Sequence, residues 1–201
     1  PLCLYKHVPN GSGKTTAINC MLSLLKYDKG SIHIFGEEMR PDNYKVKQQI
    51  GIVLQNVAVF DELTVYENID YFCGLYIKDK QKRKELVEEA IAFTGLSDFR
   101  KMRPKKLSGG LLRRLNIACG IVHKPRLIIM DEPTTSLTDP EIEKVFAILR
   151  QLRQQKVGIV FISHKLREVM EICDTYTVLR DGVMVALSLI HISEPTRHAQ
   201  I

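Results

Sequence analysis

The sequence predicts an α/β fold in which helices cover both faces of a mainly parallel sheet and a helical subdomain is inserted into it. Three observations predict this fold class. Short apolar runs that suit buried strands alternate with segments whose apolar residues recur at helical spacing. Residues 61–122 show a mostly helical pattern. The 201 residues, 45% hydrophobic and 26% charged, suffice for one domain with a substantial core.

The first part of the chain predicts one helix and two strands. Residues 15–26 suit a helix, residues 28–30 a turn, and residues 31–35 and 50–54 short strands. The apolar positions that would form one face of the helix are Ile18, Met21, Leu22 and Leu25. Strands that alternate with helices along the chain are what a parallel sheet with covering helices requires.

From residue 61 the pattern becomes mostly helical, most clearly at residues 85–93. The apolar face of that helix would consist of Leu86, Ala90, Ile91 and Phe93. Further along, strands and helices alternate again. Buried strands are predicted at 126–130 and 157–162, helices at 140–155 and 166–172, and a hairpin at 175–185 that turns at Asp181-Gly182. The central helical stretch therefore interrupts an otherwise alternating chain.

The composition narrows the class of protein. No apolar run approaches the roughly 18 residues of a membrane span, and no signal peptide is visible, so we expect another polypeptide or domain to supply any membrane crossing. Five scattered cysteines argue against a disulfide framework and fit a reducing compartment, so we expect a cytoplasmic protein. Much of the net charge of +6 lies in residues 78–106. Glutamates interleaved there favour a solvated helix face over a surface for nucleic acid or lipid, so we expect no nucleic-acid partner.

The strongest local motif is NGSGKTT before the first predicted helix, formed by Asn10, Gly11, Ser12, Gly13, Lys14, Thr15 and Thr16. Its glycines let backbone amides face a phosphate, and the helix adds its positive end. Lys14 can reach β- and γ-phosphates, and the Thr15 hydroxyl can bind Mg²⁺. The alternative is a plain turn before a helix. Val8 stands where the full pattern G-x-x-x-x-G-K-[ST] has glycine, which strains any loop that needs positive φ there.

A second motif, LIIMDE, is an apolar strand that ends in two carboxylates. The carboxyl ends of parallel strands are where α/β sheets bind ligands. Asp131 is placed to hold Mg²⁺, and Glu132 can polarise an attacking water. Taken alone, the motif fits equally well a strand that leaves the core into a polar turn.

The third motif is LSGG, in which Ser108 suits a helix N-cap and Gly109 and Gly110 leave amides open at the helix start. This predicts a second anion site, unless the motif is only a helix cap. One nucleotide cannot easily use both anion sites of one protomer, so a head-to-tail dimer is expected. Gln55 and His164, each at the end of a predicted strand, are further candidates for contacts with Mg²⁺, water or the γ-phosphate.

The ordered series NGSGKTT, Gln55, LSGG, LIIMDEP and His164 resembles the nucleotide-binding domain of ABC transporters over residues 9–186. The resemblance implies a P-loop NTPase fold, ATP and Mg²⁺ as cofactors, and ATP hydrolysis in a dimer with a second nucleotide-binding subunit, identical or different. It also implies coupling to a transmembrane permease, which would hold the protein at the cytoplasmic face of the membrane.

The resemblance also assigns roles to residues. Residues 10–16 would bind ATP, Thr15, Gln55 and Asp131 would hold Mg²⁺, and Glu132 would be the catalytic base. His164 would be the switch histidine and Gln55 the link to the permease. Ser108, Gly109 and Gly110 would bind the ATP of the partner.

Two departures from the family pattern concern its subfamilies. Leu111 replaces the glutamine of LSGGQ, a variation that some exporter-type cassettes tolerate, and residues 50–121 resemble cassettes that export drugs, lipids or antibiotics. The sequence TSLTDP, with Thr138 where an aspartate is usual, resembles cassettes of sugar importers instead. The first half is therefore exporter-like and the second half importer-like.

The domain organisation follows from these motifs. We expect a first part of the ATP-binding core at 1–57, the helical subdomain at 58–114, a second part of the core at 115–186 and a non-native tail at 187–201. The tail begins LSLIHISEPTR, which resembles a translated sequencing adapter. The resemblance implies that about two strands and an adenine-contacting aromatic residue are missing before the phosphate loop. A soluble, ribosome- or DNA-associated ABC ATPase and an inert fragment remain alternatives.

Overall fold

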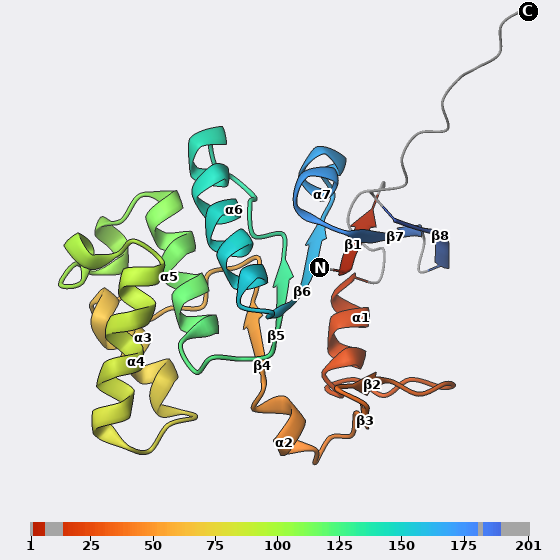
Figure 1. Ribbon diagram of the computed structural model, residues 1–201, viewed down its shortest axis with the longest axis horizontal. Helices are drawn as coiled ribbons and strands as arrows, with labels where there is room; N and C mark the ends of the chain where they lie inside the picture. The colour runs from red at the N-terminus through yellow and green to blue at the C-terminus, as the bar shows by residue number, and fades with distance from the viewer. Residues whose placement is uncertain (1, 7–13, 181–182, 190–201) are drawn as a thin grey trace, which may run out of the picture.

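The computed structural model describes residues 2–6, 14–180 and 183–189 (Figure 1). Its centre is a six-stranded sheet in the order β4-β5-β6-β1-β7-β8. The strands are β1 (Leu2–Lys6), β4 (Ile50–Val53), β5 (Leu127–Asp131), β6 (Gly158–Ser163), β7 (Thr175–Arg180) and β8 (Val183–Leu189). All neighbours from β4 to β7 pair in parallel, and β8 pairs with β7 antiparallel. The mainly parallel sheet predicted from the sequence is therefore confirmed.

Helices flank this sheet, and a second, two-stranded hairpin lies beside it, formed by β2 (His33–Ile34) and β3 (Glu37–Glu38). The helices are α1 (Lys14–Met21), α2 (Tyr44–Lys47), α3 (Val65–Gly74), α4 (Lys80–Phe93), α5 (Gly109–Ile121), α6 (Asp139–Gln154) and α7 (Leu166–Ile172). Short 3-10 turns at Ser97–Phe99 and Pro104–Lys106 lead from α4 into α5.

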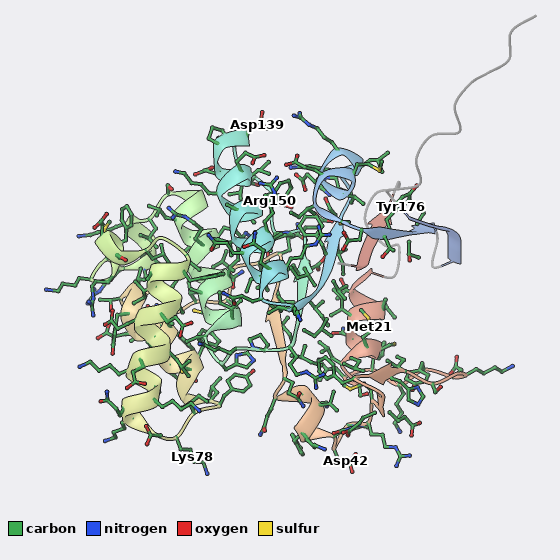
Figure 2. The ribbon with its side chains drawn as sticks, viewed as in Figure 1. Met21, Asp42, Lys78, Asp139, Arg150 and Tyr176 are labelled. Carbon is green, nitrogen blue, oxygen red and sulfur yellow. The ribbon has the colours of Figure 1, made fainter. Side chains whose placement is uncertain are left out.

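Alternate side chains of β5 pack on opposite faces of the sheet, as expected for a buried strand. Ile128 and Met130 belong to a core with α5, α6 and α7, whereas Ile129 packs with Ile18 and Leu22 of α1 on the other face. Figure 2 shows Asp139 at the first turn of α6 and Arg150 further along the same helix. Both faces of the central strands are covered, so their apolar runs have no polar alternation.

The helices α3, α4 and α5 form the predicted helical subdomain around a core of their own, which includes Ile69, Val87 and Leu115, none of them exposed. The opposite face of α5, with Ile117 and Ile121, packs against the sheet. Because α5 is continuous and shared by both cores, the boundary expected between residues 114 and 115 falls inside a helix.

Several boundaries differ from the sequence prediction. The first helix ends at Met21 instead of Lys26, because Ser23 takes a positive φ of 52° and interrupts the helical backbone. Leu25, predicted to be on the apolar face, is 46% exposed. The strand predicted at 31–35 shrinks to the two residues of β2. The strand β1 and the single-turn helix α2 were not predicted.

The C-terminal hairpin is confirmed and is longer than predicted. Its second strand continues to Leu189, so Leu187 and Ser188 of the expected tail pair with Thr177 and Tyr176 of β7. The turn at 181–182 and residues 190–201 lie outside the described residues.

The cysteines and the helix lengths test two further expectations. Cys20, Cys73 and Cys119 are free, whereas Cys173 is disulfide-bonded, which the cysteine count did not lead us to expect. Among the described helices, none combines the length and the hydrophobicity that crossing a lipid bilayer requires.

The contact between β4 and α5 depends on two glycines. A Cβ atom added to Gly51 would overlap the carbonyl oxygen of Gly120 and lie 3.0 Å from Cγ of Pro125. A Cβ atom on Gly120 would in turn lie 2.9 Å from a methyl group of Val53. The sheet and the helix that joins the subdomains therefore approach too closely for any side chain at these positions.

We expect Gly51→Ala to lower the free energy of unfolding by about 2 kcal/mol, because β4 and α5 must separate to admit the methyl group. Urea unfolding followed by circular dichroism measures this loss. Gly74→Ala is the matched control: its Cβ would meet only the flexible Arg83 side chain, at 3.0 Å, so stability should change by about 0.5 kcal/mol or less. Equal losses in the two variants would contradict the prediction.

Candidate functional site

The five parallel strands of the described sheet end at the same edge, where ligands bind in α/β folds. Val53 of β4 is in register with Met130 of β5, and Asp131 with Ile162 of β6, so the residues that follow these strands emerge side by side. The arrowheads of β4, β5 and β6 point to this edge (Figure 1). Chain continuity thus places Gln55 after β4 and Glu132 after β5.

Glu132 and His164, both predicted from the sequence, meet at this edge. The Nδ1 atom of His164 lies 3.2 Å from Oε2 of Glu132, and the two side chains are 49% and 10% exposed. The hydroxyl of Thr135 donates to the same oxygen at 3.2 Å. The Glu132 amide donates to the carbonyl of Ile162 at 2.9 Å, which fixes the residue although its φ is +45°.

This geometry has a definite chemical capacity. A nearly buried carboxylate can accept a proton from a water molecule, and a half-exposed imidazole beside it can orient that carboxylate and contact an anion. A positive φ in a non-glycine residue is uncommon, and strained backbone of this kind concentrates at functional sites. The pair is therefore the part of the edge best suited to catalysis.

A buried glutamate that sequence reasoning missed joins the two loops that carry this pair. Glu168 of α7 accepts hydrogen bonds from Thr134, after β5, at 2.5 Å and from Ser163, at the end of β6, at 3.1 Å. Lys165 forms an ion pair with it at 3.0 Å. The only sequence signal for this role is a glutamate set among apolar residues in a short helix.

The predicted phosphate loop is described only in part. Val8 and the motif residues Asn10 to Gly13 lie outside the described residues, and Lys14 begins α1. Thr15 and Thr16 are exposed in the first turn of this helix. The strand β1 ends at Lys6, at the same edge of the sheet as its parallel neighbour β6, which His164 follows.

The residues predicted to bind Mg²⁺ form a suitable set of donors. Thr15, Gln55 and Asp131 offer a hydroxyl, an amide and a carboxylate oxygen, and hard cations such as Mg²⁺ prefer oxygen ligands together with phosphate and water. Gln55 is exposed and Asp131 partly exposed at the sheet edge. Among the described residues no cluster of three or more His, Cys, Asp or Glu side chains is arranged to hold a metal ion.

The predicted N-cap at Ser108 is confirmed, since its hydroxyl accepts a hydrogen bond from the amide of Leu111 at 3.3 Å. The expectation that both glycine amides are open is wrong for Gly110. Its amide donates to Oε1 of Glu141 at 3.0 Å, and Gly110 is buried, whereas Gly109 is exposed. The signature motif therefore already binds a carboxylate of its own chain.

Arg113, another residue that sequence reasoning missed, ties the helix α5 to the loop of Gln55. Its guanidinium donates to the carbonyl oxygens of Leu54 and Gln55, both at 2.9 Å. The side chain is 5% exposed, and burial lowers the pKa of Arg113. The partners are almost 60 residues apart in sequence, so no local pattern reveals the contact.

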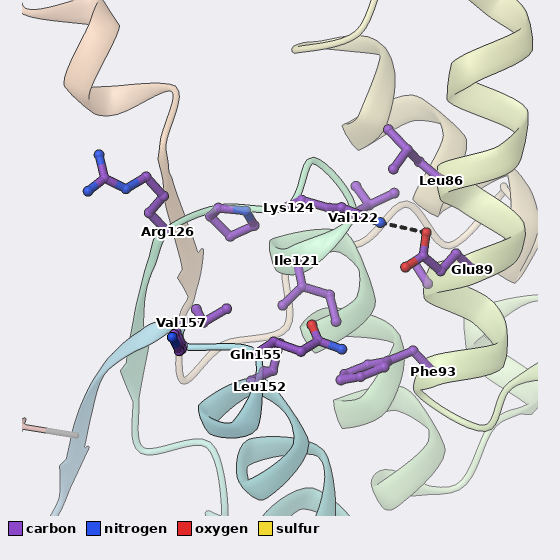
Figure 3. Close-up of a pocket in the computed structure, with 13 residues that line it drawn as sticks. Leu86, Glu89, Phe93, Ile121, Val122, Lys124, Arg126, Leu152, Gln155 and Val157 are labelled. Carbon is purple, nitrogen blue, oxygen red and sulfur yellow. Dashed lines mark ion pairs between the residues drawn. The ribbon is translucent and has the colours of Figure 1, made fainter.

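A cavity of about 300 Å³ lies between α4, the end of α5 and the end of α6 (Figure 3). Its lining includes Phe93, Ile121 and Leu152, and Lys124 forms an ion pair with Glu89 at 2.7 Å across its rim. Arg126, just before β5, and Val157, just before β6, place the cavity at the opposite edge of the sheet. The catalytic candidates do not line it.

Comparison with known proteins identifies relatives of this chain. The ABC transporter family matches residues 9–135. The chain is 33% identical over 179 residues to the linearmycin resistance ATP-binding protein LnrL of Bacillus subtilis. The matched region covers 89% of this chain and 58% of that protein. It is 38% identical over 184 residues to the ribose import ATP-binding protein RbsA of Bacillus licheniformis, covering 88% of this chain and 37% of the relative.

Solved structures share the fold. CbiO1 from Clostridium perfringens, part of the ABC transporter complex cbiONQ, aligns with a TM-score of 0.85 at 23% identity, covering 94% of this chain and 77% of that one. The ATP-binding cassette MJ0796, dimeric and bound to ADP and Pi after hydrolysis, aligns with a TM-score of 0.81 at 24% identity, covering 94% and 84%. The chain described here belongs to the ABC transporter family, as an ATP-binding domain with its α/β P-loop NTPase fold.

Proposed function

We propose that this chain binds and hydrolyses ATP as a subunit of an ABC transporter, in a head-to-tail dimer that drives a membrane permease. The observation that carries the proposal is the Glu132–His164 contact of 3.2 Å at the sheet edge where the strand before NGSGKTT also ends. The experiment that tests it measures phosphate release from ATP and Mg²⁺ by the chain and by its Glu132→Gln and Lys14→Ala variants.

Each residue at this edge has a part in the proposed reaction. Residues 10–16 bind the phosphates, and Thr15, Gln55 and Asp131 hold Mg²⁺, which neutralises charge on the β- and γ-phosphates when it is bound. Glu132 accepts the proton of the attacking water, and His164 orients Glu132 and contacts the γ-phosphate. Glu168 keeps the loops of these two residues side by side through Thr134 and Ser163.

The dimer is proposed because the chain has two anion sites, NGSGKTT and LSGG, that lie at the starts of different helices. NGSGKTT leads into α1, which begins at Lys14, whereas Ser108 and Gly110 lie at the start of α5 and bond to the first turn of α6. A head-to-tail partner lets one nucleotide use the first site of one protomer and the second site of the other. MJ0796, which shares the fold, was solved as a dimer in a post-hydrolysis state.

The permease is proposed to bind an apolar patch beside the loop of Gln55. This patch consists of Phe60, Tyr71 and Leu75, which are 42%, 48% and 63% exposed. The rings of Phe60 and Tyr71 lie edge to face with centroids 4.8 Å apart. Exposed groups of large apolar side chains mark interaction sites. CbiO1, which shares the fold, is part of a multi-subunit transporter complex.

We expect Tyr71→Glu to weaken permease binding about tenfold or more, because it places a charge where an aromatic side chain would be buried in the interface. Co-purification with a co-expressed ABC permease measures the effect. Tyr44→Glu is the matched control, since Tyr44 is 68% exposed on α2, outside the patch. Permease binding that survives Tyr71→Glu, or is lost equally in both variants, would contradict this placement of the interface.

A further inference from the structure

The carboxylate of Glu141 bridges the core and the helical subdomain. Its Oε2 atom accepts hydrogen bonds from the amide and the hydroxyl of Thr138, at 3.1 and 3.0 Å, and so caps α6. Its Oε1 atom accepts from the amide of Gly110 at 3.0 Å and lies 3.5 Å from the hydroxyl of Ser108. One side chain thus serves the start of α6 and the start of α5.

The contact with Gly110 is closely fitted. A Cβ atom at position 110 would lie 2.5 Å from Oε1 and 2.6 Å from Cγ of Glu141, so only glycine admits the carboxylate here. Hydrogen bonds from the Thr138 amide, the Thr138 hydroxyl and the Gly110 amide lower the pKa of Glu141, in that order of size. The side chain is therefore an anion at neutral pH, held at the positive end of α5.

A second helix shows that capping alone does not need this bridge. Glu67 forms the same capping box with Thr64 at the start of α3, and it uses a single oxygen, Oε2, for the Thr64 amide at 2.7 Å and the hydroxyl at 2.8 Å. Glu141 likewise caps with one oxygen, but its other oxygen is directed at the signature motif. The bond to Gly110 is thus additional to the local cap.

We propose that Glu141 occupies the anion site of the signature motif in the free chain, and that the γ-phosphate of the partner's ATP must displace it before the dimer closes. This inference rests on the proposed function, in which Ser108 and Gly110 bind that phosphate. The amide of Gly110 cannot serve two anions at once, and two negative charges at contact distance repel each other. Glu141 therefore sets the ATP concentration at which the dimer forms.

The surroundings give the displaced carboxylate a place to go. A cavity of about 170 Å³ beside it is lined by Phe99, Leu111, Arg114 and Lys144 together with the signature residues. Arg114 already interacts electrostatically with Glu141. Two cations next to the site keep the released carboxylate near the boundary between the subdomains, so it can return once phosphate leaves.

The test uses Glu141→Asp, which keeps the charge but draws the carboxylate back by one methylene, away from the Gly110 amide that it reaches at 3.0 Å. Glu67→Asp is the matched control, because it shortens an equivalent cap that makes no bridge. Glu141→Gln, which removes the charge, should act in the same direction as Glu141→Asp. Melting curves of all variants establish that each one is folded.

The first measurement follows the amide signal of Gly110 by NMR while the nucleotide-free chain is titrated with inorganic phosphate. The second follows sedimentation of the chain with increasing ATP in a Glu132→Gln background. With Glu141→Asp, both the phosphate and the ATP needed at half-saturation should fall about tenfold, the effect of one hydrogen bond to a charged group. Glu67→Asp should match the unmodified chain in both.

The outcomes separate the two proposals. An unchanged phosphate titration in Glu141→Asp overturns the inference, as does a shift of the same size in Glu67→Asp or a dimer that forms at unchanged ATP. Tighter phosphate binding in a chain that stays monomeric at saturating ATP would instead overturn the head-to-tail dimer of the proposed function, while the competition by Glu141 would stand.

Discussion

Glu132→Gln should leave ATP binding near normal and slow hydrolysis by a factor on the order of 10²–10⁴, the usual contribution of a general base. The amide keeps the size of the side chain and the contact near His164, which in the structure is 3.2 Å from Oε2. It cannot accept the proton of the attacking water, so an ATP-bound dimer should accumulate. Phosphate release and sedimentation with ATP measure the two effects.

Lys14→Ala is the contrasting variant. It removes the positive charge that stabilises the β- and γ-phosphates and leaves the proposed base in place. It should abolish turnover without accumulating an ATP-bound dimer. Normal hydrolysis by Glu132→Gln would show that another group is the base. If both variants lost ATP binding equally, it would be wrong to assign ATP binding to NGSGKTT and proton transfer to LIIMDE.

The sequence sufficed for the elements whose signal is local. Residues 126–130 and 157–162 were predicted as strands from their apolar runs, and β5 and β6 lie within one residue of these limits. The helix α7 was predicted with its observed bounds. Glu132 and His164 were predicted at strand ends because each closely follows one of these apolar runs.

The elements that were missed are fixed by distant partners. The five residues of β1 have little pattern of their own, and their strand conformation depends on pairing with β6 and β7, where Leu2 faces Val160 and Thr175. The helix α2 has only four residues and depends on the cap from Asn43 and on the burial of Val46. Such non-local stabilisation overrides weak propensity in short segments.

The supporting contacts of the site were hidden for the same reason. Glu141 and Gly110 are separated by 31 residues, and Arg113 and the Leu54 carbonyl by 59. One local signal was available: Thr138 and Glu141 have the T-x-x-E spacing of a capping box. That spacing predicts the cap of α6, but not that the second carboxylate oxygen reaches another subdomain.

Ser108→Arg should suppress ATP-driven dimerisation and turnover at least about tenfold, while binding of ATP to the monomer stays nearly intact. The hydroxyl that caps α5 and faces Glu141 would be replaced by a long cation at the positive end of a helix, where charge of that sign is unfavourable. The larger side chain would also occupy the space that a partner's phosphate must enter. Monomer binding should survive because NGSGKTT leads into α1, a different helix from α5.

Thr64→Arg is the control for this variant, since it removes the equivalent cap of α3 without touching the signature motif. Both variants should lose about 1 kcal/mol of stability from the missing cap, measured by urea unfolding. Only Ser108→Arg should lose dimerisation, measured by sedimentation with ATP in the Glu132→Gln background. If the Ser108→Arg monomer lost ATP binding as strongly as it lost dimerisation, the motif would act within its own protomer. A motif that binds only the ATP of a partner cannot affect ATP binding by a single chain.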